Sequence, residues 1–537
     1  MNARARLFVA ALALCAGVAA APASRSSLVP DRPGTTPSYW CTWTAQGNRT
    51  SPGNTFGADV DVPHERIAEE VNERTVFGPG GWAHTLYPKV RGDLFLMFDV
   101  GWDVPAGESF DKARWKLGRV EIAGDKFPCC AAPGAEGLRR LNDETKAAGW
   151  RAAGLWIAAH AYGDGREQLL RPLAEIEGYF RERLRWSHDA GIGYWKVDYG
   201  ARHGDLAFRR MLTRLAAEVA PGLLVEHARG GGPVNDDNAP WDSGPAHHSG
   251  RFASWHDGAE LRRSIEVVRI GPVFRTYDTI TVFSVPTTLD RVVPVLSALG
   301  DDRGVTGLIN CEDEPYIAAG LGLAMGIMRY PIPAKPGFEP RADEVTRAVR
   351  WQRLAPAFAV GAAATAVSDR VLVDRWRFAK GDSWATWLEG QELPQGAPAV
   401  SARGLPLPRV AADGEPPFVV ASRHPSGATA VATLPRRLVG RGEFMPLADV
   451  TVEVVDASQP VGVFGEYRTL TLALAAGRRV TRVLAQDLAA DRTVDVTGRV
   501  ALQAGSVTIP GAVIAEVGRS AQTPGDFSRP GLVLRLE

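Results

Sequence analysis

The chain of 537 residues carries 61 basic and 61 acidic side chains, and 45% of its residues are hydrophobic. This charge balance argues against nucleic acid or an anionic membrane as the main partner. The length indicates two or more domains, or one large α/β barrel with an additional domain. The 15 tryptophans supply core residues and also flat rings on which sugars can stack.

The first 23 residues are typical of a secretory signal peptide. Arg4 and Arg6 precede an apolar segment from Leu7 to Val18, and small residues that suit cleavage follow this segment. No other apolar run is long enough to span a bilayer. We therefore expect a secreted or periplasmic protein that has no membrane partner.

Four cysteines follow the signal: Cys41, Cys129, Cys130 and Cys311. In an exported chain they allow two disulfides, but the sequence does not determine which residues pair. No Cys or His spacing resembles a zinc site, and the chain lacks both a GxGxxG motif after a strand and a P-loop. We therefore expect neither a metal nor a nucleotide cofactor.

Residues 24–365 alternate between short apolar runs and amphipathic helical patterns. The strand-like runs are Ser38–Thr44, Asp93–Val100, Arg151–Ala158, Ile192–Tyr199, Gly222–His227, Gly271–Thr276, Val305–Asn310 and Met325–Tyr330. Helical patterns include residues 169–191 and 205–222, and a last one that ends near Phe358. Eight strands with helical crossovers predict a (β/α)8 barrel, the TIM barrel, rather than a doubly wound sheet.

Residues 366–537 have a different pattern. Runs such as VLVDRWRF, DVTVEVV and YRTLTLAL alternate in polarity, are rich in β-branched residues, and are separated by Gly, Pro and Asp turns. This pattern predicts an all-β domain, an antiparallel β-sandwich that follows the barrel.

Polar and aromatic side chains gather at the predicted carboxyl ends of the barrel strands, where barrel enzymes place their chemistry. In chain order they are Trp43, Asp99, Trp102, Trp156, Lys196, Asp198, Glu226, Arg275, Asp278 and the segment Asn310 to Asp313. Glycoside hydrolysis requires two carboxyl groups for the reaction, and it also uses groups that hold sugar hydroxyls and rings. Carboxylates interleaved with tryptophans around one rim therefore indicate a glycosidase.

The segment YWKVDYG, residues 194–200, places a lysine and an aspartate two residues apart. Side chains at this spacing share one face of a strand, so Tyr194, Lys196 and Asp198 are expected to point the same way. On spacing alone, a structural ion pair explains Lys196 and Asp198 as well as a catalytic site does.

Five segments in order resemble clan D of the glycoside hydrolases, the α-galactosidase group of families 27 and 36. FDVGW at 98–102 is similar to the DDGW segment of that group, and residues 125–158 are similar to its passage from FP through a helix to GLWI. WKVDYG resembles the strand that bears the nucleophile, VEHARGGGP at 225–233 resembles a family 36 turn, and FRTYDTI at 274–280 resembles the acid/base segment. The resemblance spans roughly residues 37–333.

The resemblance implies a role for each residue at the rim. Asp198 matches the nucleophile, and an ammonium at Lys196 would favour its carboxylate form and could hold a sugar hydroxyl. Asp278 matches the acid/base, although Asp242, Asp257 and Glu312 are loop acids that could take this role. Glu226 matches a glutamate near C2 of the sugar, or is a structural acid. The remaining residues would bind substrate: Trp43, Asp99, Trp102, Trp156 and Arg275. Each of the three tryptophans is alternatively a core residue.

The resemblance thus implies a retaining exo-glycosidase that acts on α-galactose-like ends of an oligosaccharide or polysaccharide. Alternatives on the same fold are a β-L-arabinopyranosidase, an α-N-acetylgalactosaminidase, an isomaltodextranase and a non-catalytic carbohydrate-binding protein. Val100 departs from the family, where a second aspartate follows the first and the pair holds the hydroxyls at C4 and C6 of galactose. We therefore expect altered demands at C6 of the glycone.

Overall fold

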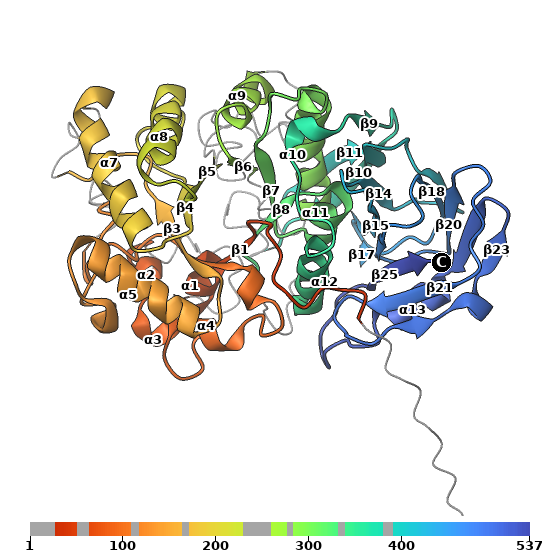
Figure 1. Cartoon of the computed structure of the whole chain (residues 1–537). Coiled ribbons are helices and arrows are strands. Elements are labelled where there is room, and N and C mark those ends of the chain that lie inside the picture. The colour runs from red at the N-terminus through yellow and green to blue at the C-terminus, as the bar shows by residue number, and fades with distance from the viewer. Residues whose placement is uncertain are drawn as a thin grey trace, which may run out of the picture.

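The computed structural model describes residues 27–50, 64–108, 117–163, 171–228, 259–276, 283–330, 339–379 and 390–537. The predicted signal peptide, Asp242, Asp257 and Asp278 lie outside these ranges. Figure 1 shows a helical half that contains the barrel and a half built mostly of strands, with α10 (Ser284–Leu299), α11 (Pro315–Leu321) and α12 (Ala342–Gln352) between them.

Eight parallel strands close into a barrel in sequence order, which confirms the predicted fold. They are β1 (Tyr39–Cys41), β2 (Phe95–Phe98), β3 (Ala152–Ile157), β4 (Tyr194–Val197), β5 (Leu224–Ala228), β6 (Val273–Arg275), β7 (Leu308–Glu312) and β8 (Ala324–Ile327). β1 pairs with both β2 and β8, so the barrel has no edge strand.

The other helices lie between and around these strands. They are α1 (Trp43–Thr50), α2 (His64–Glu69), α3 (Glu73–Val76), α4 (Trp82–Thr85), α5 (Gly134–Ala147), α7 (Leu173–Asp189), α8 (Leu206–Val219) and α9 (Ala259–Val268), with 3-10 turns at Arg91–Asp93, Pro128–Cys130, Val360–Ala362 and Thr497–Arg499. Local chemistry sets some of the ends: Asp205 caps α8 by accepting from Phe208 N–H at 3.1 Å, and Gly322, in the left-handed region, ends α11.

Alternation along the strands divides the barrel residues into an inner and an outer layer. Tyr39, Phe95 and Tyr194 belong to an apolar cluster inside the barrel, whereas their neighbours Trp40 and Trp195 belong to the large core beneath the helices. Tyr39 on β1 reaches across the interior and donates to Glu226 on β5. The period of two therefore directs polar groups of β4 to β7 into the barrel.

The first predicted strand is too long at its carboxyl end. β1 ends at Cys41, and Trp43 is the first residue of α1 rather than a strand residue. The Thr42 carbonyl accepts from Gln46 N–H at 2.9 Å, and the Thr42 hydroxyl donates to the Gln46 side chain at 2.6 Å. These bonds begin a helical turn where the apolar pattern alone favoured continued strand.

The remaining strands form the all-β part of the chain. They are β9 (Thr365–Val367), β10 (Val371–Arg377), β11 (Glu392–Pro398), β12 (Val400–Arg403), β13 (Arg409–Ala411), β14 (Phe418–Arg423), β15 (Thr429–Leu434), β16 (Arg436–Leu438), β17 (Gly442–Phe444), β18 (Asp449–Val454), β19 (Val461–Phe464), β20 (Thr469–Leu474), β21 (Val483–Asp487), β22 (Val494–Asp495), β23 (Ala501–Gln503), β24 (Ser506–Pro510) and β25 (Gly531–Leu536), with helix α13 (Gly511–Gly518).

An eight-stranded sheet, β22-β21-β25-β19-β15-β14-β12-β9, packs on a five-stranded sheet, β13-β18-β20-β24-β23. Val419 and Val431 of the first sheet share a core with Leu470 and Val507 of the second, as expected for a sandwich. Most strand pairs are antiparallel, but β12–β14, β15–β19 and β18–β20 are parallel. β10–β11 and β16–β17 form two further two-stranded ribbons.

Candidate active site

Lys196 lies between two carboxylates at the carboxyl end of the barrel. Its ammonium is 2.8 Å from Asp99 Oδ2 and 3.2 Å from Asp198 Oδ2. Burial and Arg275 act to lower the pKa of Lys196, but Asp99, Cys41 and Asp198 outweigh them and raise it above its ordinary value. The group is therefore a permanent cation that holds two acids side by side.

Asp99 directly follows β2 and is held by groups from three segments. Besides Lys196, its side chain accepts from the Cys41 thiol at 2.9 Å and from Val100 N–H at 2.9 Å. Its own N–H donates to the Thr42 hydroxyl at 2.9 Å. Burial acts to raise the pKa of Asp99, but Lys196 and these hydrogen bonds lower it below its ordinary value. Asp99 is thus a fixed carboxylate.

Asp198 directly follows β4 and is held through one of its two carboxylate oxygens. Its Oδ2 accepts from the Trp156 indole N–H at 3.1 Å and faces Lys196, whereas Oδ1 accepts no hydrogen bond from the part of the chain that the structure describes. Its backbone N–H donates to the Ile157 carbonyl at 3.0 Å, which ties the residue to β3. A carboxylate held through one oxygen can use the other as a nucleophile.

The three predicted tryptophans lie in different places. Trp156 contacts Asp198 and shares a small apolar cluster with Val100, and the partly buried Trp43 packs against that cluster. Trp102 is 0% exposed, lies in the main core, and donates its indole N–H to the Trp156 carbonyl at 3.0 Å. Trp102 therefore offers no open face for a sugar and supports Trp156 from behind, so of the two roles open to it from sequence, pocket wall or core, it has the core role.

Glu226 is completely buried on β5 and both of its oxygens are occupied. Oε1 accepts from the Tyr39 hydroxyl at 2.9 Å, and Oε2 accepts from the Tyr194 hydroxyl at 2.7 Å and from the Asn310 amide at 2.6 Å. Burial raises the pKa of Glu226, although Arg275 and these donors act in the opposite direction. Glu226 therefore anchors the floor of the site.

Arg275 on β6 forms a buried ion pair with Glu312, the last residue of β7, and contacts Met328 Sδ at 2.8 Å. Both charged side chains are at most 1% exposed. Glu312 thus lies in a strand and neutralises Arg275, which corrects its assignment as a loop acid. Burial acts to lower the pKa of Arg275, but Glu312 and other nearby acidic groups raise it.

The structure brings Lys196, Asp198 and Asp99 together with Trp156. The sequence predicted this grouping, because Lys196 and Asp198 share a strand face and all four residues lie near strand ends. The sequence reasoning placed Asn310 at the rim but gave it no partner, and it missed the thiol of Cys41. Cys41 is the last residue of β1, so counting every inward position at the strand ends would have found it.

The four cysteines after residue 26 are free thiols in this structure. Cys129 and Cys130 are adjacent in a 3-10 turn, and their sulfur atoms are 3.1 Å apart. Among the described residues, no three His, Cys, Asp or Glu side chains are grouped as ligands of a metal ion. Within the same ranges, no helix is both long enough and apolar enough to cross a membrane.

No protein-family model matches the sequence, and no curated protein does. Solved structures with a related chain path include a family GH27 β-L-arabinopyranosidase from Geobacillus stearothermophilus in complex with arabinose (10% identity, 93% of this chain and 97% of that chain covered, TM-score 0.37). An α-galactosidase from Saccharomyces cerevisiae with raffinose shows 11% identity over 94% of this chain and 98% of that chain, with a TM-score of 0.36. A glucosidase from Croceicoccus marinus shows 10% identity over 83% and 89%, with a TM-score of 0.31. These values are too low to support an argument about family or activity.

Proposed function

We propose that the protein is an exported retaining glycoside hydrolase that removes α-galactose-like residues from the end of a saccharide. The observation that carries the proposal is the Asp198 carboxylate, which is held on Oδ2 by Lys196 at 3.2 Å and Trp156 at 3.1 Å. Its location just past β4 fits the face at which barrel enzymes carry out their chemistry.

In the first step, Asp198 Oδ1 attacks the anomeric carbon while the bond to the leaving oxygen breaks. Asp278, which lies outside the described residues, gives its proton to that oxygen. In the second step Asp278 takes a proton from water, and the water oxygen displaces Asp198 and regenerates the free carboxylate. The two inversions give a product with the original anomeric configuration.

The neighbouring groups support this reaction by fixing the nucleophile. Because the Lys196 ammonium also binds Asp99 at 2.8 Å, it cannot swing away from Asp198 without breaking a second buried contact. The Trp156 indole N–H sets the orientation of the Asp198 carboxylate plane. Trp102 supports Trp156 by donating its indole N–H to the Trp156 carbonyl at 3.0 Å. Precise placement of a reacting group accounts for a large part of enzymatic rate enhancement.

A pentopyranoside such as a β-L-arabinopyranoside is a second candidate substrate, and Val100 favours it. Val100 is 4% exposed and packs with Val104, Leu117 and Trp156. An apolar wall at this position offers no partner to a C6 hydroxyl. A glycone without C6 leaves no polar group unpaired there.

Replacement of Asp198 by Asn tests the proposal. We expect the activity of Asp198→Asn on a panel of nitrophenyl glycosides to fall by several orders of magnitude with an unchanged melting temperature. Asp189→Asn is the matched control, because its carboxylate on α7 is 62% exposed and, among the described residues, pairs with His188 alone. A mechanism-based epoxide or fluorosugar should label Asp198, and NMR should show retention of configuration. Labelling of another residue or an inverted product would contradict the assignment.

A further inference from the structure

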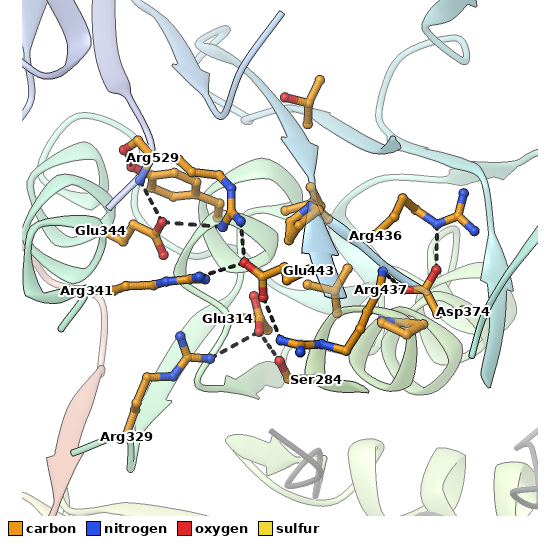
Figure 2. A pocket seen from close by; sticks show the side chains of 16 residues that line it. Ser284, Glu314, Arg329, Arg341, Glu344, Asp374, Arg436, Arg437, Glu443 and Arg529 are labelled. Atoms are coloured by element: carbon orange, nitrogen blue, oxygen red, sulfur yellow. Dashed lines mark hydrogen bonds and ion pairs between the residues drawn. The ribbon is translucent and has the colours of Figure 1, made fainter. Parts of the chain in front are cut away.

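The pocket where the barrel meets the β-sandwich is lined by charged side chains that bind one another (Figure 2). Glu443 on β17 accepts from Arg341 at 2.6 Å and from Arg437 at 2.9 Å. It also accepts from Arg529. Burial acts to raise the pKa of Glu443, but these guanidinium groups lower it far below its ordinary value. The charges of this pocket therefore hold the β16–β17 ribbon to the segments that precede α12 and β25.

A pair of neighbouring thiols lies elsewhere, in the connection between β2 and α5. Cys129 and Cys130 are the last two residues of the 3-10 turn Pro128–Cys130, and their sulfur atoms are 3.1 Å apart. Cys129 is exposed, whereas Cys130 is buried. A thiol that solvent reaches therefore lies against a second thiol that solvent does not reach.

The other two thiols of the described chain are enclosed and bonded separately. Cys41 is buried and donates to Asp99 Oδ2 at 2.9 Å. Cys311 is also buried and donates to the Glu314 carbonyl at 3.5 Å. Among the described residues, Cys129 is thus the one exposed thiol, and it has a thiol as its neighbour.

The turn that carries the pair is held from both sides. Pro128 at its first position has a fixed φ, and Phe127, immediately before it, is 0% exposed in the main core. The Cys129 N–H donates to Glu73 Oε2 at 2.7 Å, and the Cys130 N–H donates to the Phe127 carbonyl at 2.9 Å. Because both backbone positions are fixed, the turn keeps the two sulfur atoms close together.

The surroundings of the pair keep both sulfur atoms protonated at neutral pH. Burial raises the pKa of both thiols, to about 11 for Cys130. Hydrogen bonds with Cys130 and Glu73 raise the pKa of Cys129 further. For Cys130, Glu144 and Glu73 also raise the pKa, whereas the hydrogen bond with Cys129 and the charge of Arg140 act to lower it. A thiol attacks a disulfide only as the thiolate, so alkaline solution speeds any exchange at this pair.

A disulfide between adjacent residues is strained. Neighbouring Cα atoms lie about 3.8 Å apart across a trans peptide bond, whereas the Cα atoms of disulfide-linked residues usually lie roughly 4.4–6.8 Å apart. Closing a bond between Cys129 and Cys130 therefore distorts the turn, and strain of this kind makes a disulfide easier to reduce. Such a bond fits a reversible site rather than a permanent crosslink.

We propose that Cys129 and Cys130 form a reversible dithiol–disulfide site that exchanges with small disulfides such as glutathione disulfide. In the first step, Cys129 loses its proton to solvent and its sulfur attacks one sulfur of the small disulfide. That S–S bond breaks, one glutathione leaves as a thiolate and takes up a proton, and the other stays bound to Cys129.

The second step uses the buried partner. Cys130 loses its proton and attacks Cys129 Sγ, which lies 3.1 Å away before the reaction, and the second glutathione leaves and takes up a proton. The two cysteines are oxidised to one disulfide, and glutathione disulfide is reduced to two thiols. The exposed residue thus receives the oxidant and the buried residue resolves the mixed disulfide. This chemistry goes beyond the proposed glycosidase function and does not depend on it.

Peptide mapping by mass spectrometry tests the inference, after the full chain has been incubated with glutathione disulfide in mildly alkaline solution and quenched with an alkylating agent. We expect the wild-type peptide that spans Cys129 and Cys130 to lose the mass of two hydrogen atoms and to carry neither glutathione nor an alkyl group. Dithiothreitol should restore both thiols. Cys41 and Cys311 should be alkylated as free thiols once the protein is denatured.

Three serine variants separate the two steps. Cys130→Ser should stop the reaction after the first step, so that Cys129 keeps one glutathione. Cys129→Ser should leave Cys130 a thiol, because solvent does not reach it in the folded chain. Cys311→Ser, which removes a buried thiol from β7, is the matched control and should behave as the wild type. The melting temperature shows that each variant is folded, and a transient mixed disulfide on Cys129 in quenched wild-type samples reports the first step independently of the variants.

A wild-type peptide that keeps glutathione on Cys129, or that stays unmodified while the denatured chain reacts, would overturn the inference. Glutathione on Cys130 in folded Cys129→Ser would overturn it as well, and a bond that resists dithiothreitol would contradict the reversible role. The readout involves no glycoside. Asp198→Asn should therefore give the wild-type result, so the thiol site and the glycosidase proposal stand or fail separately.

Discussion

Val100 is the residue at which this chain departs most clearly from the α-galactosidase pattern. It follows Asp99, is 4% exposed, and shares an apolar cluster with Trp156, against which Trp43 also packs. A sugar hydroxyl that faces this cluster would lack a partner, at a cost of about 1–3 kcal/mol or roughly a factor of ten to a hundred in affinity.

We therefore expect Val100→Asp to shift the preference of the proposed glycosidase toward galactose. The quantity to compare is kcat/KM for an α-D-galactoside and for a β-L-arabinopyranoside, in the wild type and in the variant. Val100→Ala is a useful control, because it removes the isopropyl group without adding a hydrogen-bonding group. A wild type that already strongly prefers galactose, with a ratio unaltered in Val100→Asp, would show that this position does not recognise C6.

Residue-level prediction from sequence worked where strand alternation applies. Tyr194 and Lys196 are two apart on β4, and both point into the barrel, where Tyr194 reaches Glu226 and Lys196 reaches Asp99. Alternation does not extend into the turns past the strand ends. Trp102, four residues past β2, therefore could not be assigned to the core or the site from its spacing.

At the scale of elements, the turn after β4 determines where Asp198 is held. Gly200 has a φ of 151°, and a Cβ added there would lie 2.7 Å from Ala159 N and 2.8 Å from His160 Nδ1. The turn therefore packs directly on the end of β3, where Tyr199 O accepts from Ala159 N–H at 2.8 Å. Only glycine allows this close approach.

We expect Gly200→Ala to lower kcat by at least about tenfold, because a shift of about 1 Å in a reacting group has large kinetic effects. The melting temperature should also fall. Gly204→Ala in the same loop is the matched control, since a Cβ there meets no atom within 4 Å. Steady-state kinetics and thermal denaturation of the two variants measure the difference, and equal kinetics would show that the turn does not position Asp198.

The predicted strands overlap the observed ones, but most extend past them. The carboxyl end is the part affected: Asp99 and Asp198 lie just beyond β2 and β4, not within them. Each of these turns still contains buried or aromatic residues, such as Val100 and Tyr199, so composition does not show where the hydrogen-bond ladder stops. The order of the strands was predictable because each run was separated from the next by a helical pattern.

At the scale of the whole molecule, the barrel and the sandwich share one core. Val420 and Ala432 of the eight-stranded sheet cluster with Ile317 and Trp351 of the barrel helices, whereas Val419 and Val431 face the second sheet. Strands β14 and β15 are consequently buried on both faces. Their continuous apolar runs indicate strands that are buried on both faces. The runs do not identify the element that covers the second face, because any apolar surface can bury it.

The junction also contains a fully buried ion pair. Arg347 on α12 binds Asp487 at the end of β21 through its Nε at 2.9 Å and Nη2 at 3.2 Å, and both side chains are 0% exposed. Asp487 in addition accepts from the N–H groups of Ala489 and Ala521, at 2.8 and 2.9 Å. Both oxygens of the Asp487 carboxylate thus accept hydrogen bonds within the junction.

We expect Asp487→Ala to lower the free energy of unfolding by about 3–5 kcal/mol, because it leaves a buried guanidinium without its partner. Glu516→Ala is the matched control: it breaks an exposed pair with Arg499 in the sandwich, which solvent screens, and should cost far less. Denaturant unfolding of both variants gives the comparison. The double variant Arg347→Met with Asp487→Leu should recover much of the loss, since apolar side chains can fill the space without a buried charge. A similar cost for the two single variants would mean that this pair does not hold the barrel and the sandwich together.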